Sequence, residues 1–389
     1  MKVYHQTGHN LKWNIDSLKD KVGDGLIFSP VNIDADKLLE FSKDIKKESF
    51  LDPQLYLLNQ AKGSLETYPY FPGNLKPDFA TVDLDSDSAK LAKVCVDYQQ
   101  ENDFEYIVIP TKYYEENPTN YLLQCTEYFV IPFTNYIGEI NNSKKILLSV
   151  IVKNIMLVDT DKRNEILNWI TGHIEINGVY LIFENNFSTK QIKDFDYLFN
   201  ALNFIKVLKD NELEVHLGYT NTESFIYSIA MPDSITIGSY ENLRSFGIRR
   251  FQDLENGVMR SPNARLYSGK LLQWIDYGYV QSMKRLVDDY ENFFEESKHS
   301  PLNFAPEENW QFKKTAPYMH FFYIFYNQIL DLPNSQKDRI SYVKECIKKA
   351  IGLYKEIENK DVLLDQNSDG SHLNIWYNVV SSFQRDLNG

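Results

Sequence analysis

Eight short apolar runs, each ending in polar residues and most followed by a helical pattern, occupy the first 240 residues of the chain. Strands that alternate with helices in this way are typical of a parallel sheet. Eight such units in about 240 residues match the size of a closed (β/α)8 barrel. The runs are Lys2–Gln6, Gly25–Ser29, Ser49–Gln54, Tyr106–Thr111, Ile146–Val152, Val179–Asn185, Glu214–Gly218 and Ser234–Ser239. We therefore predict an α/β fold, a (β/α)8 TIM barrel whose site lies at the carboxyl ends of the strands.

The chain has 389 residues, which is more than a bare barrel of about 250 residues requires. We predict a barrel over residues 1–243, an arginine-rich loop over residues 244–270, and a C-terminal helical module over residues 271–389. In that module the spacing of apolar residues predicts four helices, Leu271–Glu296, Lys313–Leu332, Ser335–Asn359 and His372–Leu387.

The cysteines and the N-terminus indicate the compartment. The three cysteines are scattered and have no CxxC spacing, so they predict neither a zinc cluster nor a disulfide framework. The N-terminal residues lead straight into a strand without a signal-peptide pattern, and no apolar stretch is suited to crossing a membrane. We expect a cytoplasmic protein in a reducing compartment, with no membrane association, no metal and no cofactor.

The charge of the chain is unevenly distributed. A net charge of −13 argues against a nucleic-acid partner, yet five of the nine arginines lie between Arg244 and Arg265. Arginine suits bidentate contacts with phosphate, and the loops after the last two barrel strands often bind phosphate. A solvated basic surface is the alternative. The predicted phosphate-binding residues are Arg244, Arg249, Arg250, Arg260, Arg265 and Lys270.

Two carboxylates close predicted strands. Asp52 follows the third run and precedes a proline, and Glu184 ends the sixth run. Carboxylates in a desolvated cleft can serve as general acid and general base, so we predict Asp52 and Glu184 as the catalytic pair. The alternatives are a turn-capping role for Asp52 and a salt bridge from Glu184 to Lys112 or Lys153.

Other polar or small residues at strand ends and in a long loop are predicted to line the pocket. The loop Ala61–Asp85 is rich in Pro, Gly and Tyr, and its position after the third strand places it over the mouth of the barrel. A pinned surface loop is the alternative for this segment. The predicted pocket residues are His5, Gln6, Gln54, Tyr68, Tyr70, Asn185, His216 and Gly218.

The barrel segment resembles the tRNA-guanine transglycosylase superfamily, including its DNA-acting relatives. Phe50–Gln54 is similar to the strand that ends in the family's catalytic Asp, and Leu217–Tyr219 with Met231–Thr236 resembles a late strand–helix–strand segment. The chain departs from the family after Asp52, where the glycine turn is absent. It departs again at Thr236, which stands where the nucleophilic Asp is expected, and it lacks the zinc ligands.

The resemblance implies cleavage of a nucleobase–sugar bond with water as the acceptor, because the covalent nucleophile is missing. Asp52 would activate water or stabilise the sugar cation, and a flipped base would enter the tyrosine-rich mouth. The implied partner is nucleic acid, with DNA favoured over RNA, and the implied setting is removal of modified bases in antiviral defence. The protein partners are not predicted.

Two other functions remain open from the sequence. One is a metal-dependent barrel hydrolase that uses His5, His9, Asp52, Glu184 and His216. The other is a non-enzymatic scaffold, in which the helical module docks a partner protein.

Overall fold

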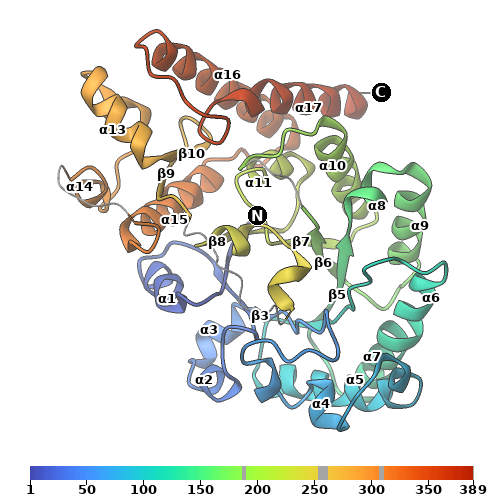
Figure 1. Cartoon of the computed structure of the whole chain (residues 1–389). Coiled ribbons are helices and arrows are strands. Elements are labelled where there is room, and N and C mark those ends of the chain that lie inside the picture. Colours follow the sequence, from blue (N-terminus) through green and yellow to red (C-terminus); the bar gives the residue numbers. More distant parts are fainter. Residues whose placement is uncertain (186–189, 253–261, 306–310, 389) are drawn as a thin grey trace.

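The computed structural model describes residues 1–185, 190–252, 262–305 and 311–388. Eight parallel strands form one sheet in the order β3-β2-β1-β8-β7-β6-β5-β4. The two ends of this sheet meet, because the Glu105 amide, just before β4, donates to the Ser49 carbonyl, just before β3, at 2.8 Å. The predicted (β/α)8 barrel is therefore confirmed (Figure 1). The strands are β1 (Lys2–Gln6), β2 (Gly25–Phe28), β3 (Phe50–Leu51), β4 (Tyr106–Ile109), β5 (Lys145–Val152), β6 (Gly178–Phe183), β7 (Glu214–Gly218) and β8 (Ser234–Gly238).

Helices surround the strands, and several of them begin at acidic caps. The Asp34, Asp159 and Asp194 side chains accept hydrogen bonds from the first free amides of α2, α9 and α10. The helical elements of the barrel are α1 (Leu11–Lys19), α2 (Ala35–Leu39), α3 (Lys43–Lys47), the 3-10 helix η1 (Leu65–Thr67), α4 (Pro72–Leu75), the 3-10 helix η2 (Thr81–Asp83), α5 (Leu84–Glu101), α6 (Tyr121–Cys125), the π-helix η3 (Thr126–Val130), α7 (Ile131–Glu139), α8 (Asn154–Val158), α9 (Thr160–Thr171), α10 (Phe195–Asp210), α11 (Ser224–Tyr227) and the 3-10 helix η4 (Ser228–Ala230).

The segment after β8 differs from the prediction. Arg265–Ser268 and Gln273–Asp276 pair antiparallel as a hairpin, so the predicted helix Leu271–Glu296 is wrong at its start and the predicted loop ends in a strand. The physical reason is the turn at Gly269 between two short apolar segments, each of which is buried as a strand. The elements here are α12 (Glu241–Arg244), the 3-10 helix η5 (Ile248–Phe251), β9 (Arg265–Ser268), β10 (Gln273–Asp276), α13 (Tyr277–Leu286), the 3-10 helix η6 (Tyr290–Phe293), α14 (Ser300–Asn303), α15 (Thr315–Leu330), α16 (Gln336–Glu358) and α17 (Ser371–Asn388).

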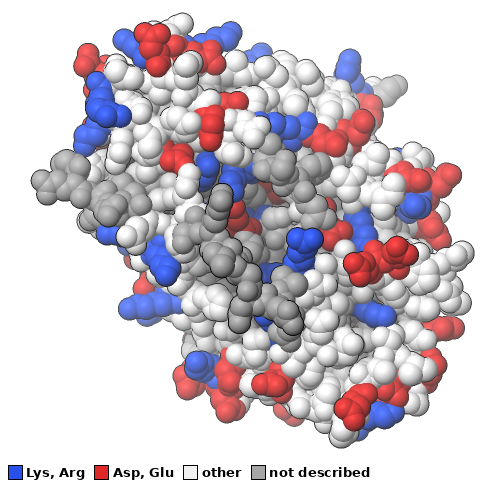
Figure 2. Space-filling view, in the orientation of Figure 1, with Lys and Arg blue, Asp and Glu red and all other residues white. Residues whose placement is uncertain are grey.

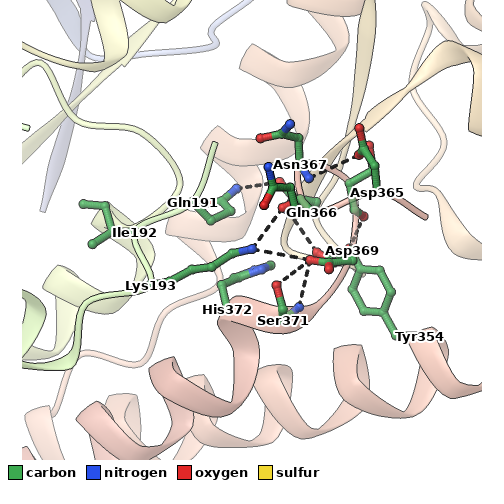
Figure 3. A network of polar contacts seen from close by, with 12 residues as sticks. Gln191, Ile192, Lys193, Tyr354, Asp365, Gln366, Asn367, Asp369, Ser371 and His372 are labelled. Carbon is green, nitrogen blue, oxygen red and sulfur yellow. Dashed lines mark hydrogen bonds and ion pairs between the residues drawn. The ribbon is translucent and has the colours of Figure 1, made fainter. Parts of the chain in front are cut away.

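The C-terminal helices dock on the barrel through α10 and the segment before it. The Trp376 indole in α17 is fully buried and donates to the Ile192 carbonyl at 2.9 Å. Beside it, Lys193 donates to the Gln366 carbonyl at 3.0 Å and lies 3.7 Å from the Asp369 carboxylate (Figure 3). One hydrophobic core runs from the barrel into these helices. In the described ranges, no helix has the length and apolar character required to cross a membrane.

Candidate active site at the barrel mouth

A fully buried carboxylate lies at the carboxyl end of β3. Asp52 directly follows this strand and has no solvent exposure. Three tyrosine hydroxyls donate to it: Tyr56 at 2.9 Å to each oxygen, Tyr219 at 3.0 Å and Tyr180 at 3.4 Å. The Gln54 backbone amide is the fourth donor, at 3.1 Å. We call Tyr56, Tyr180 and Tyr219 the tyrosine cage.

The environment of Asp52 sets its protonation. Burial raises the pKa of Asp52 to about 6, against the lowering effects of the Tyr56 and Tyr219 hydroxyls, the Gln54 amide and the Arg250 charge. The carboxylate is therefore mostly ionised at neutral pH and takes up a proton just below it. A carboxylate with a pKa close to the working pH is suited to general-base catalysis.

The local backbone conformation orients the side chains of the tyrosine cage toward Asp52. Gln54 and Tyr219 both adopt the left-handed conformation, with φ of 54° and 53°, which is rare for residues other than glycine. The Gln54 amide nitrogen donates to the Tyr219 hydroxyl at 2.9 Å, and its oxygen accepts from Ser29 at 3.0 Å. A Cβ on Gly218 would lie 2.6 Å from the Tyr180 ring, so the glycine gives this ring its place. Gly218 thus allows the Tyr180 side chain to pack directly against the backbone of β7.

The segment after β8 covers the cage. The Phe246 and Phe251 rings lie 5.1 and 4.8 Å from the Tyr56 ring, and the Arg250 guanidinium lies 5.5 Å from the Tyr219 ring. This segment is the yellow chain in the middle of the barrel in Figure 1. Asp52 is therefore closed off from solvent in this conformation.

Glu184 lies at the same mouth in a separate environment. It is 7% exposed and accepts from the Tyr113 hydroxyl at 2.8 Å, and its backbone pairs with Phe246. In the described part of the chain, no hydrogen bond joins Glu184 to Asp52, and neither expected salt bridge to lysine forms. The neighbouring Asn185 carbonyl accepts from the Ser245 hydroxyl at 3.1 Å. The predicted catalytic pair is thus present at the mouth but is not in direct contact.

Two further predicted pocket residues adjoin the cage. The Gln6 side-chain oxygen accepts from the Tyr180 hydroxyl at 3.3 Å, while its amide nitrogen is buried without a partner. The Tyr70 hydroxyl is also buried without a partner, and burial, with a smaller contribution from the Asp52 charge, raises its pKa. Tyr68 is directed elsewhere, because its hydroxyl donates to the Ile33 carbonyl at 2.7 Å. Both tyrosines are buried, so neither forms an open platform for a ligand.

The histidines do not belong to this site. His5 points outward from β1, bonds to the Val22 carbonyl at 2.8 Å and packs against Phe322 of α15. Burial lowers its pKa to about 4. His216 lies deeper in the barrel, where it bonds to Ser234, the first residue of β8, at 2.8 Å. His9 is exposed. The prediction that His5 and His216 line the pocket is wrong.

This placement also bears on the metal-dependent alternative. The described residues hold no group of three His, Cys, Asp or Glu side chains arranged to bind a metal ion. His5 bonds to the Val22 carbonyl and His9 is exposed, whereas Asp52 is fully buried, so the five residues proposed for a metal centre do not converge.

The predicted phosphate-binding residues are dispersed. Arg265 donates to the Trp274 and Asn367 carbonyls, and Lys270 donates to two carbonyls near η6. Arg244 is buried, with its guanidinium 3.9 Å from the Trp274 ring and two of its nitrogens without partners. In this structure protein groups therefore occupy or enclose these three residues.

The other arginines remain near the mouth. Arg249 is exposed, and Arg250 is half-buried and donates to the Asn242 carbonyl at 3.0 Å. Arg260 lies outside the described residues. On the face shown in Figure 2, basic and acidic side chains are interspersed.

Sequence reasoning missed the tyrosine cage and the aromatic cover. Tyr180 lies inside an apolar run, so its type and place are those of a core residue. Tyr219 carried a usable signal, because it directly follows the last residue of β7, as Asp52 follows β3. Phe246 and Phe251 lie in a segment that was predicted only as an arginine-rich loop.

Comparison of the chain with family models, with curated proteins and with solved structures gives no significant match. What the fold and the site define is therefore a class, a (β/α)8 barrel with a caged carboxylate at its mouth.

Proposed function

We propose that this chain is a hydrolase that cleaves a nucleobase–sugar bond, with Asp52 as the general base. The observation that carries the proposal is the buried Asp52 carboxylate, which three tyrosine hydroxyls orient at the carboxyl end of a barrel strand. Catalytic residues of (β/α)8 barrel enzymes lie at this end of the strands. A carboxylate with a pKa of about 6 is matched to proton transfer near neutral pH.

The proposed reaction is a hydrolytic displacement at the anomeric carbon. Asp52 accepts a proton from water, and the water oxygen forms a bond to C1′ of the sugar. The C1′–N bond breaks, its electron pair leaves with the base, and the base takes a proton from solvent. The hydrogen bonds from Tyr56 and Tyr219 hold the carboxylate in one orientation throughout.

The proposed substrate is nucleic acid, with DNA favoured and modified bases as the targets. The support is the resemblance of Phe50–Gln54 to the catalytic strand of the transglycosylases, together with Arg249 and Arg250 beside the mouth. The aromatic rings of Phe246 and Phe251 can stack on a flipped base. Because Asp52 has no solvent exposure, substrate entry requires the segment from Phe246 to Phe251 to move outward.

The closed mouth favours a second candidate, a non-enzymatic scaffold. Asp52 satisfies its oxygens with protein donors alone, and such a network can serve to specify a unique core. In this candidate the cage stabilises the barrel, and the C-terminal helices bind a partner. The scaffold predicts no base release under any condition.

The test is release of free base and formation of abasic sites. Single- and double-stranded DNA and RNA with normal and modified bases are incubated with wild type and with Asp52→Asn. We expect base release by wild type from at least one substrate, and a rate about 10²–10⁴ lower in the variant. Glu295→Gln is the matched control, since Glu295, which follows η6, is a carboxylate outside the tyrosine cage and accepts from the Gly269 amide at 3.1 Å.

Base release by Glu295→Gln at the wild-type rate, with loss in Asp52→Asn, supports the proposal. Absence of base release from every substrate by folded wild type supports the scaffold instead. Equal release by wild type and Asp52→Asn removes Asp52 from the mechanism.

A further inference from the structure

A groove open to solvent lies between α16 and α17, two helices of the C-terminal module that run side by side at the top of Figure 1. Its volume is about 510 Å³, and binding sites for ligands commonly fall in the range of about 300–1,000 Å³. The lining residues of α17 extend from Tyr377 to Asn388, which is a length of about 16 Å along the helix. The groove therefore has room for several groups of an extended ligand. We call it the α16–α17 groove.

The charged side chains at this groove are all cations. Lys344 of α16 and Arg385 of α17 line it, and no carboxylate is among the lining residues that the structure describes. Lys348, one turn further along α16, adds a third cation. The Lys344 and Lys348 ammonium groups lie 5.1 and 5.6 Å from the centre of the Tyr377 ring. Within the described ranges, none of these three cations has a carboxylate at ion-pair distance, so their charge is not compensated by the protein.

The sequence of α17 also separates this groove from an ordinary solvated surface. The chain has 54 acidic residues, yet none lies between Ser371 and Arg385. Exposed faces of soluble proteins usually mix acidic and basic side chains. Here the face beside the groove carries neutral hydrogen-bonding groups instead, from Asn378, Ser381, Ser382 and Gln384. The absence of carboxylates removes the repulsion that an anionic ligand would otherwise meet.

The hydrogen bonds within the groove leave its donors available. Lys344 donates to the Gln384 side-chain oxygen at 3.0 Å, and Arg385 donates to the Ser382 hydroxyl at 2.9 Å. Both acceptors are neutral, so an anion can replace them. Ser381 lies one helical turn from Arg385, and its hydroxyl has no hydrogen-bond partner. Lysine, arginine, serine and amide side chains are the groups that contact phosphate oxygens in nucleic-acid complexes.

We propose that the α16–α17 groove binds the phosphate backbone of a nucleic-acid strand, with Lys344, Lys348 and Arg385 each pairing with a phosphate. An acidic peptide fits this groove less well, because peptide partners are anchored by apolar or aromatic side chains in pockets. Of the described residues that line the groove, Tyr377 alone is aromatic, and two ammonium groups already lie over it. The inference takes its partner, nucleic acid, from the proposed function, but it does not require base release.

The test measures binding of a fluorescent oligothymidine strand to the full chain by anisotropy at several salt concentrations. The groove variant carries Lys344→Gln, Lys348→Gln and Arg385→Gln. At low salt it should bind at least about tenfold more weakly than wild type. The slope of log K against log salt should fall by about 2, because each phosphate contact of a single strand contributes about 0.7 to the slope.

Two further variants separate the groove from net charge and from folding. The charge control carries Lys19→Gln, Lys47→Gln and Lys349→Gln, which make the same change in charge at three exposed lysines outside the groove, and it should bind as wild type does. The conservative variant carries Lys344→Arg, Lys348→Arg and Arg385→Lys. It keeps the three cations, so it should keep the wild-type slope. The thermal melt of each variant establishes its fold.

A loss of binding confined to the groove variant supports the assignment, whether or not the protein releases bases. A wild-type slope in the folded groove variant overturns the assignment and leaves the mouth as the nucleic-acid contact. An equal loss in the charge control also overturns it, because net charge alone then explains the effect. Displacement of the DNA by polyglutamate at the same charge concentration assigns the groove to an acidic protein instead. Failure of wild type to bind the strand overturns the groove together with the nucleic-acid partner.

Discussion

The buried state of Asp52 makes a specific prediction about stability and pH. Burial raises the pKa of Asp52 from 3.8 to about 6 in the folded protein, which is a shift of about two units. Each unit corresponds to about 1.36 kcal/mol, so ionisation of Asp52 should cost the folded state roughly 3 kcal/mol. Between about pH 4 and pH 6 the folded protein holds a proton that the unfolded chain releases. Stability should therefore fall as pH rises through this window.

The assay compares wild type with Asp52→Asn by urea unfolding at several pH values from 4 to 7. All other carboxylates are common to both proteins, so their contributions cancel in the difference between the two free energies of unfolding. The wild-type value, relative to that of the variant, should decrease by roughly 2 kcal/mol between pH 4 and pH 7, because the unfolded carboxyl is already partly ionised at pH 4. The m-values should agree, since the two proteins expose the same surface on unfolding.

A difference that stays constant across this range would refute the reasoning. It would mean that Asp52 has a similar pKa in the folded and unfolded chains, and hence that the cage is open to water. A difference that increases with pH would mean that hydrogen bonds and the Arg250 charge outweigh burial.

Three further predictions address the frame of the site. Gly218→Ala should lower both the melting temperature and the rate of base release, because the added Cβ would lie 2.6 Å from the Tyr180 ring. The control is Gly138→Ala in α7, which has open space around it and should leave both quantities unchanged or raise the stability. A Gly218→Ala protein with wild-type melting temperature and base release would contradict the packing of Gly218 against Tyr180. Arg265→Gln should lower the free energy of unfolding by about 1–3 kcal/mol in urea, because the Trp274 and Asn367 carbonyls lose their donor, and a neutral effect would contradict this role. Arg249→Glu together with Arg250→Glu should flatten the salt dependence of oligonucleotide binding, and an unchanged slope would remove them as phosphate contacts.

Much of the fold follows from the sequence because buried parallel strands have a simple signature. All eight predicted runs became strands, since they are largely buried on both faces and most of them therefore carry a core of consecutive apolar residues. The hairpin was missed because Leu266 and Trp274 lie in short apolar segments whose pairing depends on a turn at Gly269. In a short apolar segment next to a helical pattern, the periodicity of the sequence does not distinguish a strand from a helix.

The site was predicted only in part, for a physical reason that concerns side-chain direction. Successive side chains of a strand alternate between its two faces, so Gln6 faces the barrel interior while His5 faces the helices. Selecting polar residues at strand ends without regard to the face on which they lie includes His5 among the pocket residues. His216 does face the interior, but it lies nearer the start of β7, away from the mouth. The cage depends on tyrosines from three separate strands or loops, which no local pattern brings together.

The most direct test of the catalytic claim is the single-turnover rate of base release between pH 5 and pH 8. The measurement is made with wild type and with folded Asp52→Asn. We predict that the wild-type rate rises with pH to a plateau with a midpoint at about 6, as the Asp52 carboxylate becomes ionised. The variant should be about 10²–10⁴ slower at every pH. A variant that keeps the wild-type rate, or a wild-type rate that does not change through pH 6, would contradict the role of Asp52 as the general base.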